Sequence, residues 1–221
     1  MARKDHWYNK SKQEGYRSRA AYKLKQLDRK EGLFGPGNTV VDLGAAPGGW
    51  LQVAAEEVGS RGTVIGVDFQ RIKSFDEEYD DWIETIRGDM TDEETKEQVR
   101  EAAGNEVDVV LSDMAPNMTG EYQLDHARSV HLARQAFETA LDVLDTGGDF
   151  AVKVFQGQDL DDLEAEIAEE FQYVRRSSPD ASRDSSSEIY LIGKHRLTAP
   201  VAVDDELDVE IVDVGSEGDG I

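Results

Sequence analysis

Two charged side chains interrupt apolar runs of this sequence and could carry chemistry. Lys153 lies in the middle of the run 150–155, and Glu188 opens the run 188–193. A lysine in a buried strand is costly unless its amine is paired or faces a cavity. The alternative is an edge strand whose lysine extends into solvent, but edge strands are seldom this apolar. We therefore expect Lys153 to face a cleft.

Asp113 and Lys23 are expected near the same cleft. Asp113 closely follows the apolar run 107–111, and the carboxyl ends of central strands are where open α/β sheets bind ligands. The segment 18–30 has the apolar periodicity of a helix, with Ser18 as its N-cap. Lys23 falls on a flank of this helix away from its apolar face and can point into the cleft. Four residues that are far apart along the chain are thus expected to form one site.

A glycine-rich turn is expected to bind the ligand of this cleft. Segment 40–50 has the sequence VVDLGAAPGGW, which predicts a buried strand, a turn containing Gly44 and Gly48, and a helix from Trp50. Such a turn lets a ligand approach bare backbone. Its spacing differs from the Gly-x-Gly-x-x-Gly dinucleotide fingerprint, and Pro47 interrupts it, which argues against a nucleotide-dependent dehydrogenase.

Two further acids indicate a nucleoside ligand. Asp68 ends the next strand-like run, 24 residues after Gly44, where α/β nucleotide folds place an acid to hold ribose hydroxyls. Asp89 follows the third run and either faces an adenine amino group or caps the helix from Thr91. No Gly-Lys-Ser/Thr follows the turn, so phosphate binding is not expected. A ligand with ribose and base but no pyrophosphate points to S-adenosylmethionine as the cofactor.

The composition restricts the class of protein. The 221 residues contain no cysteine, which excludes disulfides, a thiolate zinc site and a cysteine nucleophile. No apolar run reaches about 18 residues and no signal-like start is present, so we expect a soluble, cytoplasmic protein without membrane contact. The net charge is −23. Disorder is one interpretation of this acidity, but the regular apolar runs favour adaptation to high salt.

Residues 1–30 are basic in an otherwise acidic chain. They contain ten Lys/Arg and three Asp/Glu, so this segment carries +7. Trp7, Tyr8 and Tyr16 are interleaved with its basic residues, a mixture that suits single-stranded RNA because bases stack on the rings and cations meet phosphates. The alternative is a frayed tail. We predict an RNA-binding arm and helix over residues 1–30.

Strand and helix patterns alternate along most of the chain. Strands are predicted at 39–43, 63–67, 82–87, 107–111, 150–155, 171–176 and 188–193. This order predicts an α/β fold over residues 1–196, a Rossmann-like, mostly parallel seven-stranded sheet with helices on both faces. In residues 197–221 apolar and acidic residues alternate. This tail is predicted to be an incomplete β-barrel element, or else a terminal strand that docks elsewhere.

The combination of these segments resembles the FtsJ/RrmJ (RlmE) family of ribosomal RNA ribose 2′-O-methyltransferases. The matching segments are 18–24, 42–50, 112–117, 152–157 and 187–190. The resemblance implies a Rossmann-like fold that uses S-adenosylmethionine, with a sheet ending in an antiparallel hairpin. It implies a catalytic tetrad, which comprises Lys23, Asp113, Lys153 and Glu188. Cofactor contacts are expected at Gly44, Gly48, Trp50, Asp68, Asp89 and Asp113.

The resemblance also implies a substrate and partners. The family methylates a uridine ribose in large-subunit (23S) rRNA, so the expected partner is this RNA or the ribosomal particle. The tail resembles the start of a TRAM domain, an RNA-binding β-barrel, and the acidic surface suggests a halophilic archaeal member. We expect a monomer with no metal site. His126 and His131 are interpreted as packing or solvent residues, since no second ligand cluster accompanies them.

The chemistry can be argued beside the resemblance. A ribose 2′-hydroxyl is a weak acid and needs a base as its oxygen attacks the methyl group. Lys153 can be that base only with a neutral amine, and Asp113 and Glu188 are expected to orient the amine and the hydroxyl. Two rivals remain. One is a ribose methyltransferase for tRNA or the mRNA cap, and the other is a non-catalytic RNA-binding factor for ribosome assembly, against which the complete tetrad argues.

Overall fold

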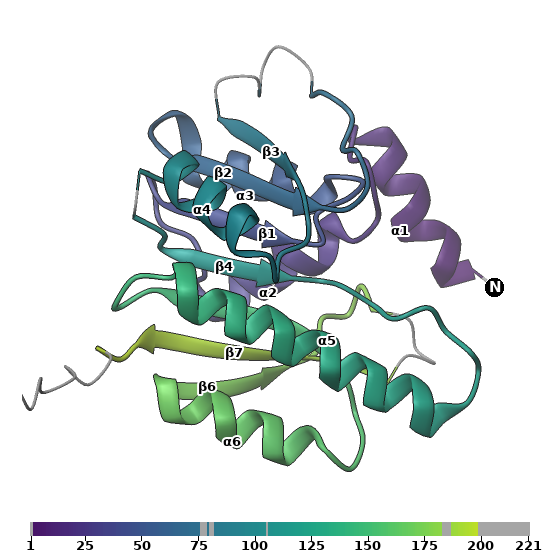
Figure 1. The fold of residues 1–221 in the computed structure, drawn as a ribbon. Coiled ribbons are helices and arrows are strands. Elements are labelled where there is room, and N and C mark those ends of the chain that lie inside the picture. Colours follow the sequence, from purple (N-terminus) through teal and green to yellow (C-terminus); the bar gives the residue numbers. More distant parts are fainter. Residues whose placement is uncertain (1, 76–78, 80–81, 105, 183–186, 199–221) are drawn as a thin grey trace, which may run out of the picture.

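The computed structural model describes the chain except for residues 1, 76–78, 80, 81, 105, 183–186 and 199–221 (Figure 1). Seven strands form one sheet in the order β3-β2-β1-β4-β5-β7-β6. Their bounds are β1 Thr39–Leu43, β2 Thr63–Asp68, β3 Ile83–Arg87, β4 Val109–Ser112, β5 Asp149–Phe155, β6 Phe171–Ser177 and β7 Glu188–Arg196. β1 to β5 are parallel, whereas β7 is antiparallel to β5 and to β6. The predicted mostly parallel, seven-stranded sheet is confirmed.

Helices cover both faces of this sheet. Their bounds are α1 Ala2–Gln13, α2 Ala21–Glu31, α3 Gly49–Val58, α4 Glu93–Ala102, α5 Tyr122–Val143 and α6 Leu160–Glu170, with a short 3₁₀ helix η1 at Gly59–Arg61. Apolar residues of α2 and α3 form one core against the sheet, and those of α4, α5 and α6 form a second core on the opposite face (Figure 1). The expected two-sided α/β architecture is thereby confirmed.

The position of β5 decides how its lysine is to be understood. β5 lies between β4 and β7, and all seven of its residues are buried, including Lys153. Continuous apolar runs such as this one form strands that are covered on both faces. The outer strand β3 is different, because three of its five residues are exposed. Lys153 therefore does not belong to an edge strand, and its amine needs partners inside the protein.

The helix predicted over residues 18–30 starts later than predicted. α2 begins at Ala21, and neither Ser18 nor its N-cap residue Ala20 caps it through a side chain. Ser18 lies against the glycine-rich turn instead, since a Cβ at position 49 would be 2.3 Å from Ser18 Oγ. Gly49 thus permits the N-terminal segment to approach the start of α3 closely.

The N-terminal segment is helical and packed rather than frayed. The Trp7 ring lies 4.9 Å from the Tyr22 ring of α2. Tyr16 is 6% exposed, and its hydroxyl donates to Glu56 Oε2 at 2.6 Å. The prediction that Tyr16 stacks on RNA bases is therefore wrong, because tertiary packing already covers its ring. Tyr8 remains 54% exposed.

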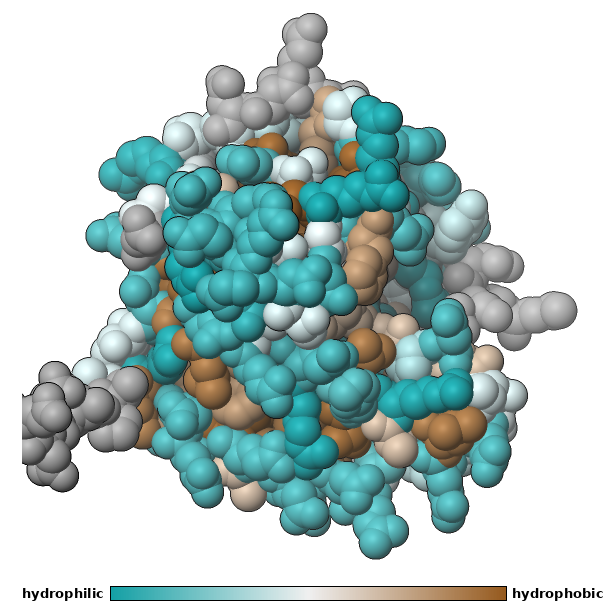
Figure 2. Space-filling view, viewed as in Figure 1, coloured by the Kyte–Doolittle hydropathy of each residue, from teal (hydrophilic) through white to brown (hydrophobic). Residues whose placement is uncertain are grey.

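The outer face over α4, α5 and α6 is largely hydrophilic, with small apolar patches between the polar side chains (Figure 2). No helix among the described residues is long and apolar enough to cross a membrane. The predicted β-barrel element at 197–221 lies almost wholly outside the described residues, which end at residue 198.

Candidate active site

The structure brings together the four charged residues that the sequence singled out. Lys153 Nζ lies 2.9 Å from Asp113 Oδ1 and also donates to the Asp113 carbonyl oxygen. Lys23 Nζ lies 2.7 Å from Glu188 Oε2 and 3.8 Å from Asp113 Oδ1. α2, the end of β4, β5 and β7 supply one residue each. Two cations and two anions therefore form one continuous network, which we call the tetrad.

Burial makes this pairing necessary. The side chains of Lys23 and Lys153 are 6% and 4% exposed, and those of Asp113 and Glu188 are each 19% exposed. A buried ammonium without a carboxylate would cost several kcal/mol. The acids are the more accessible members, so the network opens to solvent on their side. A hydroxyl entering there meets carboxylate oxygens and, behind them, the lysine amines.

Tyr190 is a further member of the site, and no role was expected for it from the sequence. Its hydroxyl donates to Asp113 Oδ1 at 2.6 Å, and its ring is fully buried 6.0 Å from the Trp50 ring. Burial and the neighbouring Asp113 carboxylate raise the pKa of this phenol well above its ordinary value. The side chain is therefore a permanent hydrogen-bond donor to Asp113. A tyrosine in an apolar strand looks like core in the sequence, so only the register of β7 beside β5 reveals this contact.

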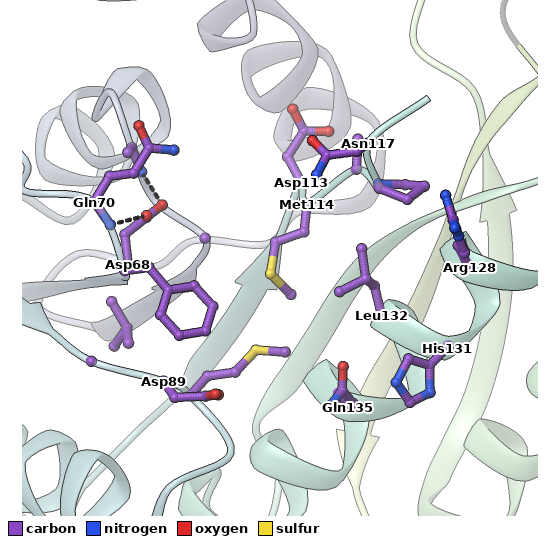
Figure 3. Close-up of a pocket in the computed structure, with 18 residues that line it drawn as sticks. Asp68, Gln70, Asp89, Asp113, Met114, Asn117, Arg128, His131, Leu132 and Gln135 are labelled. Carbon is purple, nitrogen blue, oxygen red and sulfur yellow. Dashed lines mark hydrogen bonds between the residues drawn. The ribbon is translucent and has the colours of Figure 1, made fainter. Parts of the chain in front are cut away.

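A cavity of about 760 Å³ lies beside the tetrad and shares Asp113 with it (Figure 3). Its lining includes Gly44, Asp68 and Asp89 at the carboxyl ends of β1, β2 and β3. This is the edge of the sheet where parallel α/β folds bind ligands. Acids on one side disfavour a polyphosphate ligand, and they favour hydroxyl and amino groups or a cation. The lining thus fits a nucleoside such as that of S-adenosylmethionine.

Asp68 and Asp89 are held by backbone amides. Asp68 accepts from the Ala46 amide at 2.9 Å and from the Gln70 amide at 2.7 Å (Figure 3). Asp89 Oδ1 accepts from both the amide and the hydroxyl of Thr91. The alternative role, capping a helix from Thr91, is wrong, because α4 begins at Glu93 with Asp92 as its N-cap. Asp89 instead orders the turn before α4 and lines the cavity. These bonds fix the carboxylates before a ligand arrives.

The glycine turn shapes the floor of the cavity. Gly44 has φ 77°, and a Cβ there would lie 2.1 Å from Met114 Cγ, so only glycine lets Met114 lie over the turn. Gly48 has φ 103° and is not among the lining residues. Trp50 does not line the cavity either, because its indole is buried and donates to the Ala20 carbonyl. Neither Gly48 nor the Trp50 side chain therefore forms part of the cavity wall. A cofactor contact at either position would have to be made by the backbone.

Comparison with known proteins places this geometry in a family. Residues 16–196 match the family described as FtsJ-like methyltransferase. The chain belongs to this family. The match covers every strand and every tetrad residue. It confirms the resemblance inferred from the sequence, and FtsJ-like methyltransferases are of the kind that uses S-adenosylmethionine.

Curated relatives extend over the whole chain. A protein of Haloquadratum walsbyi named ribosomal RNA large subunit methyltransferase E is 66% identical, covering 100% of this chain and 86% of the relative. Proteins of the same name from Halobacterium salinarum and Methanothrix thermoacetophila are 67% and 52% identical, covering 84% and 85% of those relatives. The strongly acidic composition accords with relatives from halophilic archaea.

A solved structure supports the fold independently. A candidate ribosomal RNA methyltransferase from Plasmodium falciparum superposes with a TM-score of 0.72 at 27% identity. The superposition covers 83% of this chain and 100% of the other. The two proteins therefore share the overall fold.

A fifth acid lies behind the FtsJ-like site. Asp42 of β1 is 2% exposed, and burial, reinforced by the Asp113 and Asp68 carboxylates, raises its pKa well above the ordinary range. The neutral form of Asp42, which burial favours, adds no negative charge to the cluster. It therefore lets the cavity hold its three lining acids without a fourth repulsive charge beneath them.

Two histidines interpreted as packing or solvent residues take different places. His126 is buried, its Nδ1 lies 3.0 Å from the Phe155 carbonyl oxygen, and its Nε2 accepts from the Asp159 amide. His131 is exposed to the cavity and lines it. The described part of the chain holds no group of three or more His, Cys, Asp or Glu residues arranged for a metal ion.

Arg17 ties the N-terminal segment to the loop beside the cavity. Its guanidinium donates to the carbonyls of Pro47, Lys73 and Ser74, and it lies 3.5 Å from the centre of the Phe75 ring. This role is not evident from the sequence, because a basic residue in a basic segment looks like an RNA contact. The interaction links the predicted RNA-binding segment mechanically to the glycine turn.

Proposed function

We propose that this chain transfers a methyl group from S-adenosylmethionine to a uridine ribose 2′-hydroxyl in large-subunit rRNA. The observation that carries the proposal is the closed tetrad at the mouth of an acidic cavity, with Lys153 Nζ 2.9 Å from Asp113 Oδ1. The names of the relatives, ribosomal RNA large subunit methyltransferase E, favour this RNA over tRNA or the mRNA cap.

The residues of the cavity divide the binding of the cofactor between them. Asp68 accepts from the ribose hydroxyls in this proposal, and Asp89 with Met90 contacts the adenine; the support is that all three residues line the cavity. Gly44 lines the cavity through its backbone, with Met114 packed beside it, and contacts the amino-acid part. When bound, S-adenosylmethionine supplies a methyl group on a positively charged sulfur. The acidic wall stabilises a cation in that place.

Lys153 is the residue placed to take the hydroxyl proton. It can do so only after its ammonium has released a proton to solvent, because a base needs a free lone pair. Asp113 holds the amine through its carboxylate and its carbonyl oxygen, which directs the lone pair toward the open side of the tetrad. Lys23 and Glu188 pair with each other and keep the Asp113 carboxylate in place. The proton would pass from the 2′-oxygen to Lys153 Nζ as the oxygen–carbon bond forms and the carbon–sulfur bond to the methyl group breaks.

A ribosome-assembly factor without activity is the rival that the tetrad disfavours. A protein without activity has no need for two buried lysines, because each buried ammonium is costly unless its carboxylate partners are kept. The test is methylation of large ribosomal subunits from cells that lack the gene, read as 2′-O-methyluridine by mass spectrometry of nucleosides. Lys153→Ala should abolish product while leaving the S-adenosylmethionine Kd within about threefold. Lys153→Arg should be equally inactive, because a guanidinium does not release its proton.

An active Lys153→Arg protein would show that position 153 only steers the substrate. If the protein methylated tRNA or cap analogues but not ribosomal subunits, the proposed RNA substrate would be wrong. Tight NAD binding in place of adenosylmethionine would remove the methyltransferase assignment itself.

The N-terminal segment is proposed to contact the RNA. α1 exposes Tyr8, and Lys12 Nζ lies 5.8 Å from the centre of that ring. Lys10, in contrast, lies over the Trp7 and Tyr22 rings and takes part in intramolecular packing. At molar salt the Debye length is about 3 Å, so stacking outlasts long-range attraction. Tyr8→Ala should therefore raise the RNA KM more than Lys12→Ala does at molar salt. If both variants had the same RNA KM as the parent, α1 would not contact the RNA and would serve only in packing.

A further inference from the structure

The wall of the cavity opposite the acids is formed by α5. Three polar side chains of this helix line it: Arg128, His131 and Gln135. Their spacing of three and then four residues puts them on one face of the helix. In Figure 3 they lie across the cavity from Asp68 and Asp89, with Met114 between the two sides. The cavity thus has an acidic wall and a separate wall that is rich in hydrogen-bond donors.

Arg128 has donors to spare. It makes no hydrogen bond and no ion pair within 4.0 Å to any residue in the described part of the chain. The nearby acid, Asp125, is already engaged, because its oxygens accept from Thr119 and from the Gly120 amide at 2.8–3.0 Å. Its influence on Arg128 is therefore that of a charge at a distance.

Another arginine of the same helix shows what a structural role looks like here. Arg134, six residues further along, forms a two-pronged pair with Glu166 at 2.8 and 2.6 Å. In a chain of net charge −23, carboxylates are abundant. Arg128 is nevertheless directed along the cavity wall toward the side where Asp113 and Asn117 lie (Figure 3). This placement leaves its guanidinium available to an incoming anion.

We infer that Arg128, assisted by His131 and Gln135, binds a backbone phosphate of the RNA strand next to the nucleotide that is methylated. A guanidinium presents two parallel N–H groups that match two phosphate oxygens. Phosphate contacts position a nucleic acid without reading its sequence. Arg128 shares one cavity with Asp113, so a strand held here lies beside the tetrad. The inference rests on the proposed function and adds an RNA-positioning site to it.

The experiment compares Arg128→Ala with Arg134→Ala, which removes the same charge from the same helix outside the cavity. Large ribosomal subunits from cells without the gene are the RNA probe. We expect Arg128→Ala to raise the RNA KM about tenfold or more and to leave the S-adenosylmethionine Kd within about twofold. The slope of log affinity for RNA against log salt should shrink by about 0.7, which corresponds to one phosphate contact. Arg134→Ala should leave all three quantities near the parent values, and Arg128→Lys should keep the salt slope.

Two results would overturn the inference. A cofactor Kd that weakens as much as the RNA KM would mean that Arg128 holds the carboxylate of the cofactor. An RNA KM and salt slope that are the same in Arg128→Ala and Arg134→Ala would mean that only overall charge matters. Filter binding of the RNA separates this inference from the proposed function. A parent protein that makes no methylated product refutes the proposed function, whereas an unchanged RNA affinity in Arg128→Ala refutes only the phosphate site.

Discussion

Tyr190→Phe isolates one hydrogen bond of the active site. The substitution removes the hydroxyl that donates to Asp113 Oδ1 at 2.6 Å and keeps the ring that packs near Trp50. A hydrogen bond to a charged group contributes about 1.5–3 kcal/mol. Lys153 would remain 2.9 Å from the same oxygen, but Asp113 would be free to rotate toward the lysines. If that orientation matters in the transition state, kcat should fall about 10- to 150-fold.

Single-turnover methylation of ribosomal subunits measures this effect on the chemical step. Tyr122→Phe is the matched control, because the Tyr122 hydroxyl also donates to an acceptor, the Gln156 carbonyl at 2.6 Å, and does not contact the tetrad. Urea unfolding of both variants separates stability from rate. The raised pKa of the Tyr190 phenol keeps it protonated, so the rate difference should persist to alkaline pH. A kcat within twofold of the parent, with or without a loss of stability, would refute an orienting role for this hydroxyl.

Three further variants test other parts of the structure. Position 44 has φ 77°, and a Cβ there would lie 2.1 Å from Met114 Cγ. Gly44→Ala should therefore lower the free energy of unfolding, measured with urea, by at least about 1–3 kcal/mol. It should also weaken cofactor binding, measured by calorimetry. Asp42→Asn should be more stable than the parent at pH 7. Burial raises the Asp42 pKa, so the folded parent must keep this carboxyl protonated at a pH where the unfolded chain ionises it. The advantage of the variant should shrink as pH falls from the raised pKa toward the ordinary value of 3.8, and a constant difference in urea midpoint would contradict this. Burial and Glu56 raise the pKa of Tyr16 from 10.0 to about 12. The free energy of unfolding of the parent should therefore fall by up to about 3 kcal/mol between pH 10 and 12, whereas that of Tyr16→Phe should not show this fall.

The central strands of the sheet were predictable because β1, β2, β4 and β5 are almost wholly buried. Residues 39–43 and 150–155 are mostly apolar runs with one charged residue each, Asp42 and Lys153, bounded by glycine or polar residues, and the alternation with helices restricts the connections between them. The same regularity brings Asp113 and Lys153 to one edge, because parallel neighbours end on the same side. The meeting of the tetrad residues followed from topology, while their catalytic roles remain predictions drawn from the family.

What the sequence could not predict depends on tertiary contacts. Ser18 has the residue type of an N-cap, yet the close approach to Gly49 occupies it elsewhere. Tyr16 looks like an RNA-stacking residue until Glu56, forty positions away, is seen to accept its hydroxyl. Trp50 matches the family motif but points into the core. Local patterns do not encode such pairings, because each depends on a partner from a distant part of the chain.

The place of β7 between β5 and β6 has a consequence for synthesis on the ribosome. Every residue that lines the cavity lies at or before position 135, whereas Glu188 is made about fifty residues later. At about 5–20 residues per second, the growing chain spends several seconds in which the cavity wall is complete and the tetrad is not. During that time the edge of β5 is open, since β6 is made first but pairs only with β7. The emerging chain can therefore form the cavity before it forms the complete tetrad, and β7 then joins β5 to β6 and adds the last tetrad residue.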